Sequence, residues 1–79
     1  MTTMAATLYD RFVTNVRLLM ESRRISQTDL AARMKCSPSY VSQILSGHRI
    51  PTLETVENVA KSLGVDPSQL FFEKFAIAS

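Results

Sequence analysis

The sequence predicts an all-α protein of five short helices in one domain that spans residues 1–79. Three observations support this fold class. Glycine and proline are scarce, with two and three residues, and β-branched residues form no long runs. Apolar residues recur at the spacing of three and four that is typical of amphipathic helices. Helix start and stop signals divide the chain at short intervals, with no repeat or linker between them.

The first two predicted helices each begin at a capping box. Thr7 caps a helix over 8–22, and Ser26 caps a shorter helix that ends near Lys35. In both, an Asp three residues after the cap can bond back to the cap's N–H. The residues expected on the inner faces are Phe12, Val16, Leu19 and Met20 in the first helix and Leu30, Ala31 and Met34 in the second.

The next two helices are delimited by hydroxyl caps and glycines. The third begins at Pro38, where a missing N–H costs nothing, and ends before Gly47. The fourth lies between Thr52 and Gly64. Its expected inner face is Leu53, Val56, Ala60 and Leu63.

The last predicted helix runs from Pro67 to about Phe75, with Asp66 as its cap and Gln69 as the partner of the cap. It carries more apolar surface than one face of a two-turn helix can bury in so small a domain. We assign Leu70 and Phe71 of this helix to the core. The rest of the segment, to about residue 77, is expected to form a two-fold dimer interface through Phe72, Phe75 and Ile77.

Composition excludes several protein classes. The single Cys36 cannot form an intrachain disulfide, and no basic stretch followed by an apolar run marks an export signal, so we expect a cytoplasmic protein. No segment has the ~18 consecutive apolar residues of a membrane span. Residues 1–49 hold seven basic and three acidic side chains, whereas residues 50–79 hold two and four. An anionic partner is therefore expected on the first part of the chain.

A helix-turn-helix is expected from about Gln27 to Gly47. In this motif a small residue, here Ala31, lets two short helices approach, and the second helix protrudes far enough to enter the major groove of DNA. The positions that must be buried hold Leu30, Met34, Cys36, Val41 and Ile44, and those left outside hold Ser39, Tyr40, Ser42 and Gln43.

The segments 26–31 (SQTDLA) and 37–42 (SPSYVS), with Gly47 and Pro51, resemble the Cro and lambda-repressor family of helix-turn-helix proteins, of the Xre type. The resemblance covers about residues 12–71. It implies a five-helix lambda-repressor-like domain, usually dimeric on palindromic operators, that regulates transcription. The short length and Phe-rich end resemble restriction-modification controller proteins, and small phage repressors fit almost as well.

Position by position, the resemblance implies that Gln27 contacts a phosphate and that Pro38, Ser39 and Gln43 contact bases. The polar residues after the third helix would meet the DNA backbone. Physical chemistry agrees, because a Gln amide can pair bidentately with adenine and short side chains permit close approach. The full expected DNA-binding set is Gln27, Thr28, Ser37, Pro38, Ser39, Tyr40, Ser42, Gln43, Ser46, His48 and Arg49.

Four positions need comment. Tyr40 has two interpretations, contact with the sugar-phosphate backbone or packing against its own helix. Lys35 stands where the family usually has Gly, which implies a left-handed residue with a Cβ. Met20 and Leu45 stand where many members carry a buried ion pair, so packing is expected to replace that pair.

Enzymatic activity is not expected. With one His and one Cys, and no phosphate-binding glycine loop, there is no nucleophile with its base and no metal-ligand spacing. We expect no catalytic residue, metal, cofactor or small-molecule ligand; the partners expected are operator DNA, a second copy of the chain and RNA polymerase. An alternative that stays open is an antitoxin of the same fold that binds a toxin protein.

Overall fold

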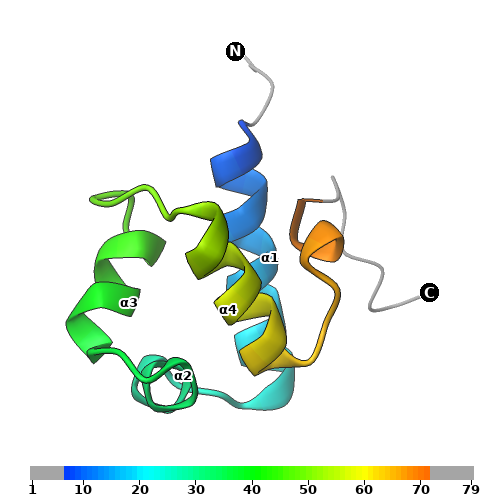
Figure 1. Ribbon diagram of the computed structural model, residues 1–79. Helices are drawn as coiled ribbons and strands as arrows, with labels where there is room; N and C mark the ends of the chain where they lie inside the picture. Colours follow the sequence, from blue (N-terminus) through cyan, green and yellow to red (C-terminus); the bar gives the residue numbers. More distant parts are fainter. Residues whose placement is uncertain (1–6, 72–79) are drawn as a thin grey trace.

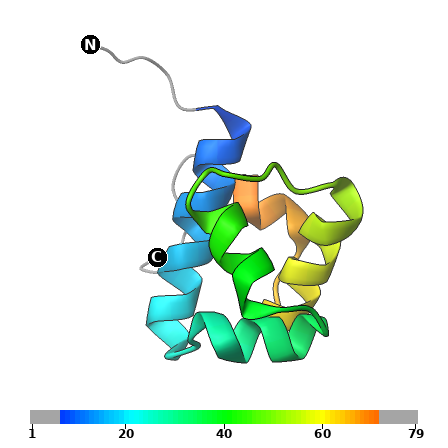
Figure 2. The same ribbon diagram turned by 90° about the vertical axis from the view of Figure 1, so that its left-hand side faces the viewer.

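The computed structural model describes residues 7–71, and within that range the fold is four α-helices followed by a 3₁₀ helix. Figure 1 shows α4 in front of α1, with α2 seen end-on at the lower end and the 3₁₀ helix η1 on the opposite side from α3. In Figure 2, turned by 90°, α3 faces the viewer. The all-α prediction is confirmed for these residues. The elements are α1 (Leu8–Arg23), α2 (Gln27–Met34), α3 (Pro38–Leu45), α4 (Leu53–Leu63) and η1 (Pro67–Phe71).

The predicted helix starts are confirmed. The hydroxyls of Thr7 and Ser26 accept hydrogen bonds from the N–H groups of Asp10 and Asp29, at 3.1 and 3.0 Å. Both Asp carboxylates accept from the cap N–H in return, at 3.2 Å. These capping boxes satisfy N–H groups that have no partner inside the helix. Hydroxyl caps also begin the next two helices, from Ser37 for α3 and Thr52 for α4.

A residue with positive φ follows each α-helix and reverses the chain. In α2 the N–H groups of Lys35 and Cys36 donate to the carbonyls of Ala32 and Ala31, at 3.2 and 2.9 Å, which is the Schellman arrangement. The expected left-handed conformation of Lys35 is confirmed by its φ of 62°. Within residues 7–71 the residues with positive φ are Arg24, Lys35, Gly47 and Gly64.

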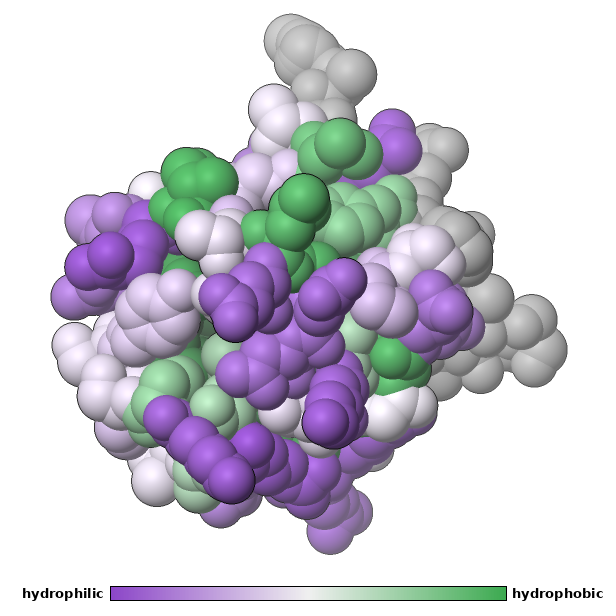
Figure 3. Space-filling view, viewed as in Figure 1, coloured by the Kyte–Doolittle hydropathy of each residue, from purple (hydrophilic) through white to green (hydrophobic). Residues whose placement is uncertain are grey.

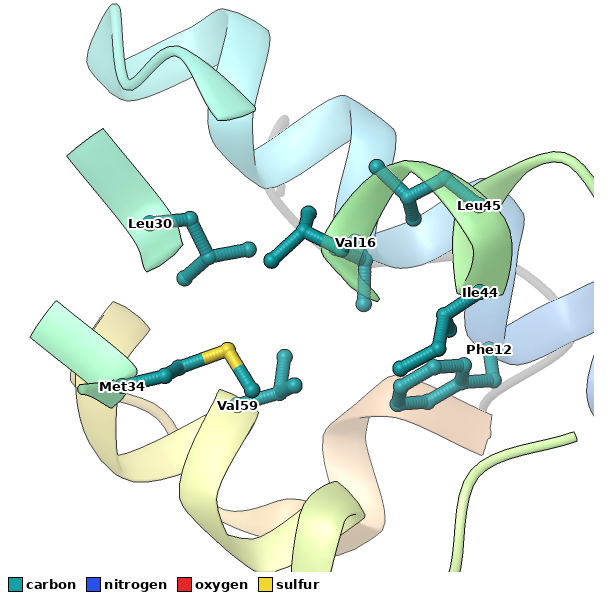
Figure 4. A pocket seen from close by; sticks show the side chains of 8 residues that line it. Phe12, Val16, Leu30, Met34, Ile44, Leu45 and Val59 are labelled. Atoms are coloured by element: carbon teal, nitrogen blue, oxygen red, sulfur yellow. The ribbon is translucent and has the colours of Figure 1, made fainter. Parts of the chain in front are cut away.

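The core lies between the inner faces of the four α-helices and η1. Figure 4 shows apolar side chains from α1, α2, α3 and α4 pointing toward one another. The helix-turn-helix residues Leu30, Met34, Val41 and Ile44 are buried as expected, whereas Cys36 is only half-buried. The buried faces of the four helices thus fix where the outward face of α3 must lie.

The prediction that Leu53 belongs to the inner face of α4 is wrong, since 82% of its surface is exposed. The buried stripe of α4 starts one turn later, at Val56, and includes Val59, which the sequence analysis did not assign. Leu53 lies on the same stripe but beyond the edge of the core. It lines a surface hollow together with Pro67 and Phe71.

The five-helix prediction also needs correction. The fifth element is a 3₁₀ helix over Pro67–Phe71. The N–H of Gln69 donates to the carbonyl of Asp66 at 2.9 Å, and a hydrogen bond between residues three apart is the pattern that defines a 3₁₀ helix. Leu70 is buried and the Phe71 ring stacks on Phe12 with centroids 5.8 Å apart, as the core assignment expected. The residues assigned to the dimer interface, Phe72, Phe75 and Ile77, lie outside the described residues.

Side chains of α1 cap the carbonyl end of α3. The Tyr9 hydroxyl donates to the carbonyl of Ile44, and Arg17 Nη2 donates to the carbonyl of Leu45 at 3.0 Å. These carbonyls belong to the last turn of a helix and have no partner inside it. The two bonds therefore fix the end of α3 against α1.

The other helix ends are tied in the same way. Asn58 of α4 donates to the carbonyl of Met34 at the end of α2, at 3.2 Å, and Arg33 of α2 donates to that of Ser62 near the end of α4, also at 3.2 Å. The buried Asn15 of α1 donates to the carbonyl of Leu70 in η1 at 2.8 Å. Arg23 of α1 also donates to the carbonyl of Leu63.

We predict that Asn15→Leu lowers the free energy of unfolding by roughly 1–3 kcal/mol, because it leaves the buried Leu70 carbonyl without its donor. Urea denaturation followed by circular dichroism measures the change. The matched control is Thr14→Leu at the adjacent exposed position, which should stay within about 0.5 kcal/mol of the wild type. Equal stability of Asn15→Leu and the control would contradict the structural role of this bond.

We predict that Lys35→Gly raises the free energy of unfolding by roughly 0.5–1 kcal/mol, since Gly adopts a positive φ without the Cβ clash that Lys35 suffers. Lys35→Ala is the control: it removes the same charged side chain, which complements the negative end of the α2 dipole, but keeps the Cβ, so the free energy of unfolding should stay the same or fall slightly. Thermal unfolding distinguishes the two variants. If Lys35→Ala raised the free energy of unfolding as much as Lys35→Gly does, the stabilisation would come from loss of the charge and not from relief of the Cβ clash.

Candidate nucleic-acid interface

The outward face of α3 is polar and carries no charge. Val41, Ile44 and Leu45 are buried against the domain, and the sequence of the helix, PSYVSQIL, contains no ionisable acid or base other than a tyrosine. The first turns of α1, α2 and α4 each contain an acidic residue, whereas that of α3 contains none. No carboxylate therefore offsets the positive end of the α3 dipole, which suits approach to an anionic groove.

The residues expected to contact DNA differ in exposure. Ser37 is exposed, but its hydroxyl already accepts from the N–H of Tyr40 at 3.2 Å, so it has a structural role as the cap of α3. Gln27, Tyr40 and Gln43 are half-buried. The exposed members of the set are Thr28, Ser37, Pro38, Ser39, Ser42, Ser46, His48 and Arg49.

A bonded network joins α3 to the connector that follows it and to α4. Arg49 Nε donates to Gln43 Oε1 at 2.9 Å, and the Arg49 guanidinium lies over the Tyr40 ring, 5.4 Å from its centroid. The Tyr40 hydroxyl shares a hydrogen bond of 3.0 Å with Thr55 Oγ1. Tyr40 therefore packs between α3 and α4. The sequence analysis had considered packing of Tyr40 against its own helix only.

The connector is organised by a second pair. Ser46 Oγ lies 2.7 Å from His48 Nδ1 and donates to the carbonyl of Gln43 at 3.3 Å. The N–H of His48 also donates to that carbonyl, at 2.9 Å. His48 is exposed, and residues 7–71 contain no group of His, Cys, Asp and Glu that could hold a metal ion. The pair therefore shapes the loop next to the end of α3.

Gln27 lies near the carbonyl end of α3, away from the start of that helix. It lines a surface hollow with Met20, Leu45 and two charged side chains of α1. Met20 and Leu45 are both buried, at 7% and 5% exposed, so apolar packing does occupy the place where the family often has an ion pair.

Three cations gather elsewhere, at the carbonyl ends of α2 and α4. Arg33, Lys35 and Lys61 line one hollow there. Their charges complement the negative ends of the two helix dipoles, so this cluster has a structural explanation without DNA.

Two ionisable groups have perturbed pKa values. Burial raises the pKa of the Cys36 thiol, so Cys36 is less reactive at neutral pH than an exposed cysteine. Hydrogen bonds from the backbone N–H and the hydroxyl of Ser68 lower the pKa of Asp66, the cap of η1. Neither group lies on the outward face of α3.

Sequence reasoning missed Thr55, the α4 residue that anchors Tyr40. Its partner lies fifteen positions earlier in the chain, and no local pattern indicates such a pair. It also missed Arg49 as the partner of Gln43. Side-chain pairs are predictable three or four residues apart on one helix, whereas these two residues are six apart and Arg49 lies in the connector after α3.

No helix within residues 7–71 combines the length and the apolarity that crossing a membrane requires.

The buried faces and the helix-turn-helix geometry define a small helix-turn-helix domain, and comparison with known proteins agrees. The family model HTH_3, described as helix-turn-helix, matches residues 16–70. The chain belongs to this family, the Xre or lambda-repressor-like type of helix-turn-helix protein, whose members are DNA-binding transcriptional regulators.

Two solved structures are similar to this chain. A hypothetical transcription factor, NHTF from Neisseria, superposes with a TM-score of 0.79 and 28% identity, over 90% of this chain and 87% of that one. The clp gene regulator ClgR from C. glutamicum superposes with a TM-score of 0.75 and 20% identity, over 84% and 86%. At that lower identity the second structure supports the fold alone. No curated protein matches the chain in sequence.

Proposed function

We propose that the chain is a cytoplasmic, sequence-specific regulator that binds palindromic operator DNA as a homodimer and controls its own gene. The observation that carries the proposal is the outward face of α3, which is polar, uncharged and held in place by the neighbouring helices. Family membership and the likeness to the Neisseria protein described as a transcription factor support it.

The fixed position of α3 is what recognition of a base sequence requires. Arg17 holds its carbonyl end and the Tyr40–Thr55 bond holds its first turns, so the helix is fixed along its length. A helix fits the major groove of B-DNA, where each base pair presents a distinct pattern of donors and acceptors. Ser39, Ser42 and Gln43 extend from α3 as short or amide side chains suited to base edges.

Selection from a pool of random duplexes, followed by footprinting upstream of the chain's own gene, tests the proposal. We expect one palindromic site to be protected by the purified protein alone, without the protein partner that an antitoxin would need. Binding should weaken as salt rises, because phosphate contacts release counterions. Affinity that stays flat with salt, or a pool with no enriched sequence, would remove the proposal.

We predict that Gln43→Ala lowers affinity for the selected site by roughly 1–3 kcal/mol and affinity for random duplex by much less, because its amide contacts a base edge. Fluorescence anisotropy on both duplexes measures the difference. The matched control is Gln69→Ala, a similar change in η1 away from α3, which should bind both as the wild type does. Equal losses on both duplexes would reassign Gln43 to the DNA backbone.

A dimer is proposed because one short helix contacts too few base pairs to single out an operator. The proposed interface is Phe72, Phe75 and Ile77. Phe71, the described residue that directly precedes this segment in the sequence, lines a surface hollow with Leu53, which supports this choice. Figure 3 shows apolar surface on the upper part of this face, above the hydrophilic exposed side of α4. Two copies joined there would present two recognition helices, roughly 34 Å apart on the DNA.

We predict that Phe75→Glu gives a folded monomer with little operator affinity, because the new charge lies opposite its own symmetry mate. Sedimentation at micromolar concentration measures the oligomeric state. Leu18→Glu, the same kind of change at an exposed apolar side chain of α1, is the control and should remain dimeric. If Phe75→Glu is dimeric as well, the interface lies elsewhere.

A further inference from the structure

The amide of Gln43 has a defined orientation. A guanidinium group only donates hydrogen bonds, so the amide atom that faces Arg49 Nε at 2.9 Å must be the oxygen, Oε1. The amide nitrogen, with its two N–H donors, is the atom left free for another partner. Gln43 is half-buried on α3, and these donors are the part of its amide that remains available to a further partner.

Arg49 is itself restrained although it is exposed. Its guanidinium lies over the Tyr40 ring, an arrangement stabilised by cation–π attraction and stacking. The hydroxyl of that ring is bonded to Thr55 Oγ1 at 3.0 Å, and Thr55 Oγ1 accepts from the hydroxyl of Thr52, the cap of α4, at 3.1 Å. The restraint on Gln43 therefore extends back to the start of α4.

This restraint bears on which base Gln43 can recognise. An unrestrained Gln amide offers one donor and one acceptor side by side, and that pair matches the N6 donor and N7 acceptor of adenine. When Oε1 is directed to Arg49, the amide presents its N–H donors to the groove. Arg49 Nε occupies one lone pair of Oε1 and fixes the amide plane, so the N–H donors are directed at the base. Guanine offers two acceptors, N7 and O6, and thymine offers O4, whereas adenine offers N7 alone beside the donor N6.

We infer that Arg49 is a specificity-determining residue that positions Gln43 to favour guanine or thymine over adenine. The inference rests on the proposed function, in which Gln43 meets a base. A side chain ordered before binding also loses less conformational entropy on binding, so the arrangement favours affinity as well as selectivity.

The test compares base preferences of the full chain on randomised duplexes for the wild type, Gln43→Ala, Arg49→Lys and Arg49→Ala. The position whose preference disappears in Gln43→Ala identifies the base that Gln43 contacts. There the wild type should favour guanine or thymine over adenine by about tenfold. Arg49→Lys keeps the charge that attracts phosphate but not the planar group that stacks on Tyr40. Both Arg49 variants should bring adenine to within about twofold of the preferred base.

His48→Ala is the matched control, since His48 is the exposed neighbour in the connector and does not bond to the Gln43 side chain. Its affinity can fall, but its base preference should equal that of the wild type. Preferences unchanged in both Arg49 variants would overturn the inference while leaving the proposed function intact. If Gln43→Ala itself changes no preference, the proposed contact and this inference both fail.

A measurement without DNA tests the restraint separately. In the free protein, ¹⁵N relaxation of the Gln43 side-chain amide should show more order than the same group in Arg49→Lys and Arg49→Ala, with the circular dichroism spectra unchanged. An amide equally mobile in all three proteins would overturn the inference.

Discussion

The fold depends on hydrogen bonds between the carbonyl end of one helix and a side chain of another. α2 and α3 have eight residues each, and the last four carbonyls of any helix lack a partner inside it, so half of each short helix needs an outside donor. Part of this need is met by the residues that reverse the chain. Much of the rest is met across the domain, by Tyr9 and Arg17 for α3, Asn58 for α2 and Asn15 for η1.

These bonds direct the helices as well as stabilising them. Apolar burial determines which face of a helix is turned inward, but because it is non-directional it specifies the exact position along the helix axis less sharply. A hydrogen bond to a particular carbonyl removes that freedom, because both distance and angle are restricted. Since α1 bonds the last carbonyls of α3, the orientation of α3 follows from α1, the longest of the described helices. A site that must match base edges needs this accuracy, which packing alone supplies less well.

Local sequence signals were sufficient to predict the four α-helices but not the hydrogen bonds that join one helix to another. Caps such as Ser26 with Asp29 act within three residues and could be predicted from the chain itself, whereas the left-handed Lys35 was implied by the family resemblance, in which Gly usually stands there. Leu53 was misassigned because its spacing fits the stripe of α4, and only the shape of the core shows that the stripe ends one turn later. The 3₁₀ form of η1 could not be predicted either, since an acidic cap followed by a first-position Pro suits an α-helix equally well.

For the candidate site too, the sequence predicted the members but not the contacts between them. Its members could be taken from the resemblance one position at a time, but their mutual bonds could not, since Gln43, Arg49 and Tyr40 meet only when the connector folds back over α3. One consequence concerns how such a site changes. Arg49 is exposed and contributes nothing to the core, so it can be substituted without unfolding the domain, whereas Tyr40 also joins α3 to α4. Substitutions in the exposed connector can therefore alter how the side chains on the uncharged face of α3 are oriented, while the carbonyl caps keep that helix in place.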